Sequence, residues 1–122
     1  MSRRVLVIDD SGLARRSARQ ILESSGFEVI EAHDGISGLE RYVVDKPEVV
    51  LLDLVMNGMY GLEVLGKLLE IDAAARVIVV SADIQKPSRD LAAGAGARAF
   101  VNKPLDKDQL LDALTAALGD TR

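Results

Sequence analysis

Short apolar runs recur along the chain, and segments with helical spacing separate them. Most of the runs are rich in valine and isoleucine, as buried strands are. They lie at Val5–Ile8, Phe27–Ile30, Val49–Leu52, Val77–Val80 and Ala99–Val101. Strands that alternate with helices form a parallel sheet covered by helices on both faces. The pattern therefore predicts an α/β domain with five strands and five helices.

In the segments between the runs, mostly apolar residues recur at a spacing that places them on one face of a helix. These positions are Ala14, Ala18, Ile21, Leu22 and Ser25 in the first segment, Ile36, Leu39 and Val43 in the second, Leu62, Leu65 and Leu69 in the third, and Leu110, Leu111, Leu114 and Leu118 in the last. The segment from Pro87 to Ala95 has smaller side chains and a weaker pattern. A helix is predicted there too, with its exit near Gly94 and Gly96.

Composition and charge narrow the function classes. The 122 residues, 48% of them hydrophobic and 28% charged, suit one globular domain spanning 1–122. The absence of cysteine excludes disulfides, and no apolar stretch is long enough to cross a membrane. A net charge of −4 gives no reason to expect nucleic-acid binding, so Arg15, Arg16 and Arg19 are interpreted as a solvated helix face. We expect a cytoplasmic protein.

Polar side chains follow four of the five predicted strands. In such sheets, binding sites gather beyond the carboxyl ends of the strands. If the first and third strands are neighbours, the aspartates that follow them converge. The residues are Asp9 and Asp10 after the first run, Asp53 after the third, Ser81 after the fourth and Lys103 after the fifth. The second run is followed by Glu31 and Ala32, which are interpreted as taking no part in this site.

Three carboxylates in one cleft raise each other's pKa unless cations lie among them. A divalent ion and Lys103 together would balance the charge of Asp9, Asp10 and Asp53. Ligands that are all oxygen suit Mg²⁺, with Mn²⁺ as the alternative. An ionised aspartate can attack phosphorus without a general base, and the Ser81 hydroxyl and main-chain N–H groups could donate to the phosphoryl oxygens. The set therefore suits phosphoryl transfer.

Taken in this order, the residues resemble the receiver domain of two-component response regulators, the CheY-like family. The resemblance covers essentially the whole chain. It rests on Asp9-Asp10, Asp53 in LLDLVM, Ser81-Ala82 in VSAD, Phe100 and Lys103-Pro104. It implies a flavodoxin-like doubly wound fold with strand order 2-1-3-4-5, the order for which CheY is a known example.

The resemblance also implies a role for each matched position. Asp53 would accept the phosphoryl group, and Lys103, preceding a cis bond to Pro104, would contact it. Ser81 and Phe100 would be the switch residues that change the surface of the fourth helix, fifth strand and fifth helix. The implied metal ligands are Asp10, Asp53 and the main-chain carbonyl of Val55, and Asp9 would reach the ion mostly through water. The main chain of Val55 and Ala82 would bind the phosphoryl oxygens.

Some positions depart from the usual family pattern. Asn57 replaces a proline and Tyr60 an aspartate, which predicts a more mobile loop after the acceptor. Phe100 lacks the hydroxyl of a tyrosine. Val55 and Asp83 occupy the two positions that tune loss of the phosphoryl group, and because Val55 cannot orient a water molecule, a long-lived phosphorylated state is predicted.

Plainer interpretations exist for each residue. Asp9-Asp10 could cap a helix, Asp53 and Ser81 could be turn residues, Lys103 could be a solvated loop lysine, and Phe100 could be plain core. His33 is interpreted as a surface residue. The combination favours the site over these alternatives.

Three functions are compatible with this site. The first is a phosphorylation switch whose partners are a sensor histidine kinase or phosphotransfer protein and an unknown output protein. It would act as a monomer or a phosphorylation-dependent dimer, and either as a stand-alone receiver or as part of a longer protein. It would catalyse only its own phosphorylation and dephosphorylation. The second is an aspartate-nucleophile phosphohydrolase resembling the haloacid dehalogenase family, which the order of the motifs disfavours. The third is a pseudo-receiver that only binds partners.

Overall fold

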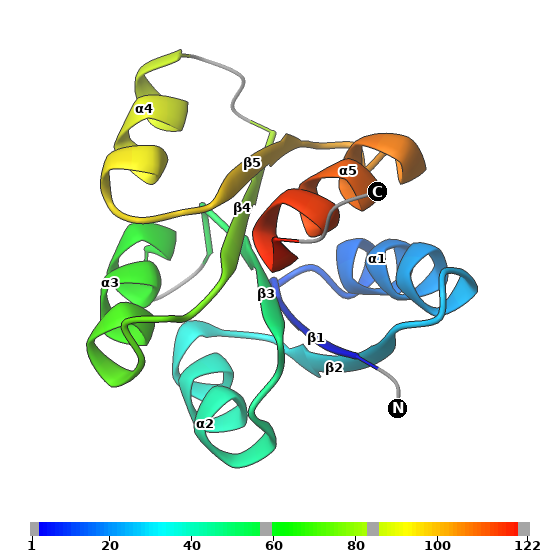
Figure 1. Ribbon diagram of the computed structural model, residues 1–122, viewed down its shortest axis with the longest axis horizontal. Coiled ribbons are helices and arrows are strands. Elements are labelled where there is room, and N and C mark those ends of the chain that lie inside the picture. The colour runs from blue at the N-terminus through cyan, green and yellow to red at the C-terminus, as the bar shows by residue number, and fades with distance from the viewer. Residues whose placement is uncertain (1–2, 57–59, 83–85, 120–122) are drawn as a thin grey trace.

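The computed structural model describes residues 3–56, 60–82 and 86–119, in which strands and helices alternate (Figure 1). The elements are β1 (Arg4–Ile8), α1 (Gly12–Ser24), β2 (Glu28–Ala32), α2 (Gly35–Asp45), β3 (Val49–Asp53), α3 (Gly61–Ile71), β4 (Val77–Ser81), α4 (Lys86–Gly94), β5 (Ala99–Asn102) and α5 (Lys107–Leu118). Among the described residues, no helix is long and apolar enough to cross a membrane.

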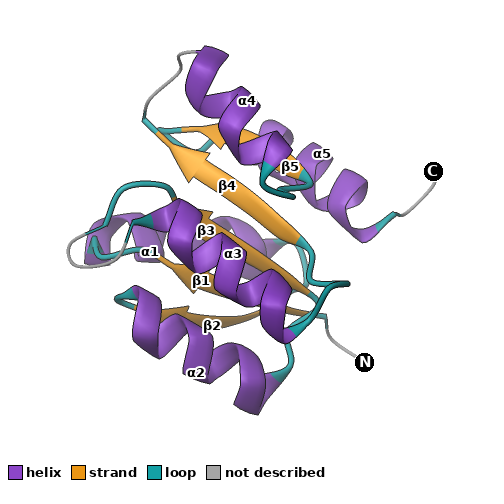
Figure 2. Ribbon diagram, turned by 90° about the vertical axis from the view of Figure 1, so that its left-hand side faces the viewer, coloured by secondary structure: helices purple, strands orange, loops and turns teal. Residues whose placement is uncertain are grey.

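The five strands form one parallel sheet in the order β2-β1-β3-β4-β5, which is the order that the family resemblance implied. Helices α1 and α5 cover one face, and α2, α3 and α4 cover the other (Figures 1 and 2). Successive side chains of a strand point to opposite faces. In β1, Leu6 and Ile8 therefore join the core under α2 and α3, whereas Val5 and Val7 join the core under α1 and α5.

The second strand lies further along the chain than the sequence predicted. It covers Glu28–Ala32 rather than Phe27–Ile30. The main-chain N–H of Phe27 instead donates to the carbonyl of Leu22 in the turn that ends α1, and pairing with the N-terminal segment begins at Glu28, whose N–H donates to the carbonyl of Arg3. Hydrogen bonding with β1, and not apolarity, sets the limits of this strand.

The predicted inner face of α2 is wrong for Ile36 and Val43, whereas Leu39 packs against the core as expected. Ile36 and Val43 are 63% and 53% exposed, and the buried side of the helix is formed by Gly35, Gly38 and Tyr42. A Cβ on Gly38 would lie 2.5 Å from Cδ1 of Ile8. The helix therefore approaches β1 through a glycine, and this close approach turns Ile36 and Val43 outward.

A buried tyrosine joins α2 to the end of α3. The Tyr42 hydroxyl donates to Oδ2 of Asp72 at 2.7 Å. Burial and this hydrogen bond raise the pKa of Tyr42 to about 12. We expect Tyr42→Phe to lower the free energy of unfolding by about 1.5 kcal/mol, the lower end for a hydrogen bond to a charged acceptor, because the substitution removes that bond and leaves the ring in place.

Denaturant unfolding of both proteins measures this loss. A tyrosine whose folded pKa is raised contributes stability that is present below its unfolded pKa of about 10 and is lost as the pH rises through the folded value. The wild type should therefore lose its advantage over Tyr42→Phe as the pH rises through that window. An advantage that stays constant up to pH ~12 would contradict the assignment.

Candidate functional site

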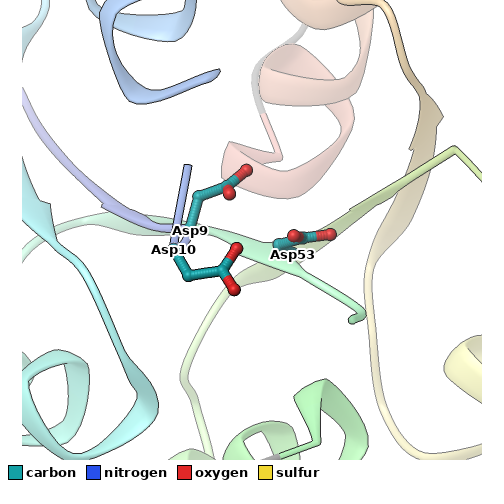
Figure 3. Close-up of side chains that lie close together, drawn as sticks. All are labelled: Asp9, Asp10 and Asp53. Atoms are coloured by element: carbon teal, nitrogen blue, oxygen red, sulfur yellow. The ribbon is translucent and has the colours of Figure 1, made fainter. Parts of the chain in front are cut away.

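Three carboxylates meet where β1 and β3 end. The two strands are neighbours, with Val7 opposite Leu51 and Ile8 opposite Leu52. Asp9, Asp10 and Asp53 each offer a carboxylate oxygen, and these oxygens all lie within 4.8 Å of one another (Figure 3). The predicted convergence of the three aspartates is therefore confirmed.

Lys103 reaches this cluster from the end of β5. Its Nζ donates to Oδ2 of Asp9 at 2.8 Å and lies 3.5 Å from Oδ2 of Asp53. Its main-chain N–H donates to the carbonyl of Ser81, which ties the β5 end to the β4 end. The bond from Lys103 to Pro104 is cis, as the resemblance implied.

The electrostatics of the cluster are set by burial and by its own charges. Burial, followed by the charge of Asp9, raises the pKa of Asp53, and Lys103 opposes this rise. Burial alone would lower the pKa of Lys103, but its hydrogen bond to Asp9 and the charge of Asp53 raise it overall. With all four groups ionised, three negative charges face one positive charge, so the cluster holds two excess negative charges.

The donor set fits a hard divalent cation. The side chains that could hold an ion all offer carboxylate oxygens, and one divalent cation would balance the excess negative charge of the cluster. Asp9 is buried and already accepts from Lys103 and from the main-chain N–H of Ser11, whereas Asp10 is exposed. Of the three carboxylates, the exposed Asp10 is therefore the one that a hydrated ion reaches most easily.

The remaining predicted residues lie at the same edge or beside it. Ser81 is buried at the end of β4, and Ala82 lines the same cavity as Asp53. The Val55 side chain is exposed, and its main-chain N–H donates to Oδ1 of Asp53 at 3.4 Å. Phe100 is half-buried on β5, with the guanidinium of Arg89 5.7 Å from its ring centroid. Two residues weighed in the sequence lie outside the described residues: Asn57 and Asp83.

Sequence reasoning missed an ion-pair network between α1 and β2, which lies beside the acidic cluster and leaves Glu31 outside it. Arg15 and Arg19 both donate to the Glu31 carboxylate, at 3.0 and 2.7 Å. Hydrogen bonding from Arg19, opposed by burial and aided by Arg15, lowers the pKa of Glu31. Arg15 also donates to the main-chain carbonyl of Asp9 at 2.7 Å. Their spacing of four residues was a sequence signal for a shared partner.

Gly61 is another residue that sequence reasoning missed. It begins α3, and its N–H donates to the carbonyl of Leu54 at 2.9 Å. A Cβ at this position would lie 2.5 Å from the carbonyl oxygen of Asp53 and 2.6 Å from Cα of Leu54. The absence of a side chain at Gly61 thus lets α3 start directly against the segment that carries Asp53.

The fold and this edge define a doubly wound α/β protein of the flavodoxin-like class, with an acidic cluster between β1 and β3. The chain belongs to the response regulator receiver domain family, whose model matches residues 5–115. The chemotaxis protein CheY of Bacillus subtilis is 37% identical over 97% of this chain and 99% of its own length.

Solved structures agree with this assignment. A CheY-like receiver domain from Methanospirillum hungatei has a TM-score of 0.89 and 28% identity, covering 98% of this chain and 95% of its own. A CheX-CheY-BeF3-Mg complex from Borrelia burgdorferi has a TM-score of 0.88 and 33% identity, covering 93% of this chain and 87% of that one. The phosphohydrolase alternative gains no support from these matches.

Proposed function

We propose that residues 1–122 form one receiver domain that accepts a phosphoryl group onto Asp53 in a Mg²⁺-dependent reaction. The donor would be a phosphohistidine on a sensor histidine kinase or phosphotransfer protein in the cytoplasm. The observation that carries the proposal is the clustering of three carboxylates within 4.8 Å beside Lys103. The CheX-CheY-BeF3-Mg complex from Borrelia burgdorferi supports it further, because it is a complex with both Mg²⁺ and a beryllofluoride group.

Each residue has a proposed task. Asp53 is the nucleophile, because its carboxylate can attack phosphorus without a base. Asp10, Asp53 and the Val55 carbonyl would hold the ion, and Asp9 would act mostly through water. When bound, Mg²⁺ (or Mn²⁺) offsets the charge on the phosphoryl oxygens. Lys103 would exchange its contact with Asp53 for one with the phosphoryl group.

The main chain and two switch residues complete the proposal. The N–H groups of Val55 and Ala82 would donate to the phosphoryl oxygens, and the Ser81 hydroxyl would move toward them. Phe100 would then turn inward, which changes the surface of α4, β5 and α5 and shifts the population toward the signalling state. The half-buried position of Phe100 supports such a movement. The output partner would be a protein that binds this surface of the monomer or of a phosphorylation-dependent dimer.

Acetyl phosphate tests the proposal directly. With Mg²⁺ present, the intact mass of the protein is expected to rise by one phosphoryl group, and NMR signals from β4, α4 and β5 are expected to shift. Removal of Mg²⁺ with a chelator is expected to prevent both changes. A protein whose mass and spectrum stay unchanged with Mg²⁺ would be a pseudo-receiver, and continuous release of phosphate from phosphomonoesters would favour a hydrolase.

The exposed side chain at Val55 leads to a prediction on lifetime. Val55 is 59% exposed and cannot hydrogen-bond a water molecule near Asp53. We expect Val55→Asn to lose its phosphoryl group several-fold faster, because an amide can orient the attacking water. Loss of mass from the purified phosphoproteins measures the two rates. Equal decay of wild type and variant would show that Val55 does not set the lifetime.

A further inference from the structure

A chain of hydrogen bonds runs from β2, an edge strand of the sheet, to the main chain between Asp9 and Asp10. The Glu31 carboxylate, near the end of β2, accepts from Nε of Arg15 at 3.0 Å. Nη1 of the same guanidinium donates to the carbonyl oxygen of Asp9 at 2.7 Å. The side chains of Arg15 and Glu31 are only 20% and 31% exposed. One arginine of α1 therefore links the edge strand to the acidic cluster.

The carbonyl oxygen that Arg15 holds belongs to the peptide group that joins Asp9 to Asp10. A peptide group is planar, so a hydrogen bond to its oxygen also restricts the nitrogen and Cα of the following residue. That residue is Asp10, whose carboxylate is directed toward Asp53 (Figure 3). The contact of Arg15 therefore acts on the direction in which the Asp10 side chain leaves the main chain.

The other contacts of Asp9 hold different parts of this residue. Its main-chain N–H donates to the carbonyl of Ala32 at 3.1 Å. Its carboxylate accepts from the N–H of Ser11 at 2.9 Å and from Nζ of Lys103 at 2.8 Å. These contacts fix the nitrogen and the side chain of Asp9, whereas Arg15 fixes the peptide group that leads to Asp10.

Glu31 can orient Arg15 because it is itself held in place. Nε of Arg19 donates to Oε2 of Glu31 at 2.7 Å, and Nη2 of Arg19 donates to the carbonyl of Val29 at 3.3 Å. Hydrogen bonding from Arg19 lowers the pKa of Glu31, which keeps the carboxylate ionised at neutral pH. Hydrogen bonds to an ionised acceptor are stronger than those to a neutral one.

We propose that Arg15 is a positioning residue for the divalent cation and that Glu31 orients it. The inference rests on the proposed function, because the ion would be held by carboxylates whose direction Arg15 fixes. The guanidinium donates in two directions from one rigid plane, which a lysine cannot do. Groups that orient metal ligands commonly change metal affinity by roughly 10–100-fold when they are replaced.

Two substitutions that preserve charge test the geometry. Arg15→Lys keeps the positive charge but cannot make both hydrogen bonds, and Glu31→Asp keeps the negative charge but shortens the side chain. We expect each to raise the Kd for Mg²⁺ about tenfold, as followed by the main-chain NMR signals of Asp10 and Asp53. Arg15→Gln should also weaken binding, although removal of a positive charge near a cation would by itself strengthen it.

Arg16→Lys and Glu23→Asp are the matched controls. Arg16 is the exposed neighbour of Arg15, and Glu23 pairs with Arg19 about two turns beyond it on α1. Both controls should keep the wild-type Kd for Mg²⁺. The double variant Arg15→Lys/Glu31→Asp should bind little more weakly than the weaker single variant, because both changes break the same chain of contacts.

Phosphorylation by acetyl phosphate adds a second readout. Saturating Mg²⁺ should restore the wild-type rate in Arg15→Lys, because Asp53 and Lys103 are unchanged. A rate that stays low at saturating Mg²⁺ would show that Arg15 acts on the transfer and not on the ion, and would overturn the proposal.

The Mg²⁺ titration also separates this proposal from the proposed function. A wild-type Kd in both Arg15→Lys and Glu31→Asp would overturn the positioning role and leave the phosphoacceptor intact. That result, together with a lower free energy of unfolding in urea, would give the network a purely structural role. A wild type that binds no Mg²⁺ would overturn the positioning role and the proposed function together.

Discussion

An Asp53→Asn protein is expected to take up no phosphoryl group from acetyl phosphate and Mg²⁺. The amide has nearly the same shape as the carboxylate but lacks the ionised oxygen that attacks phosphorus. The intact mass should therefore stay unchanged under conditions in which the wild type gains one phosphoryl group. Uptake by the variant at the wild-type rate would place the acceptor on another residue and remove the basis of the proposed function.

The same substitution is expected to preserve or increase stability. Burial and Asp9 raise the pKa of Asp53, so between the unfolded and the folded pKa the folded protein keeps a proton that the unfolded chain releases. Wild-type stability should therefore fall as the pH rises from the unfolded pKa of about 4 through the raised folded value. Asp53→Asn lacks this fall, because its amide does not ionise.

Urea unfolding without Mg²⁺, at acid and at neutral pH, measures the difference. The stability of the variant relative to the wild type should increase from acid to neutral pH. A variant that becomes relatively less stable at neutral pH would show that attraction to Lys103, 3.5 Å from Asp53, outweighs burial and repulsion. Loss of phosphorylation together with retained stability would separate the chemical role of Asp53 from a structural one.

Gly61→Ala is expected to lower the free energy of unfolding by about 3 kcal/mol, at the upper end of the usual cost of overpacking. The new Cβ would meet the carbonyl oxygen of Asp53 at 2.5 Å and main-chain atoms of Leu54 at 2.6 and 2.7 Å. Main-chain atoms at the end of a central strand cannot move aside as a flexible side chain can. We also expect a lower rate of phosphorylation, because any relief of the clash displaces Asp53.

Gly66→Ala is the matched control in the same helix. No atom that could clash lies within 4 Å of a Cβ at Gly66. Alanine there should stabilise the protein by about 0.5–1 kcal/mol, because glycine is unfavourable within a helix. Thermal or urea unfolding of the two variants compares them. Similar stability for Gly61→Ala and Gly66→Ala would show that α3 can withdraw from β3 without cost.

Local sequence patterns predicted the strands and helices but not how these elements pack against one another. Apolar runs located β1, β3, β4 and β5 to within one residue, and they did so best for β3 and β4, because a strand buried on both faces must be apolar throughout; β2, which carries two glutamates, was predicted too early in the chain. Helical spacing located α2 but put Ile36 and Val43 on its inner face, since Gly38 allows an approach that apolar periodicity does not report. Arg15 and Glu31 lie in different elements, so their pairing across α1 and β2 depends on tertiary packing.

The sequence by itself determined which side chains end each strand, because polar residues that directly follow buried runs must lie at the carboxyl edge of the sheet. That placed Asp9, Asp10, Asp53, Ser81 and Lys103 at one edge. Only the tertiary structure decided that Lys103 contacts Asp9 more closely than Asp53, and that small side chains on α1 leave a cavity beside them. Distances and unfilled volumes depend on how separate elements pack together, which no local pattern in the chain records.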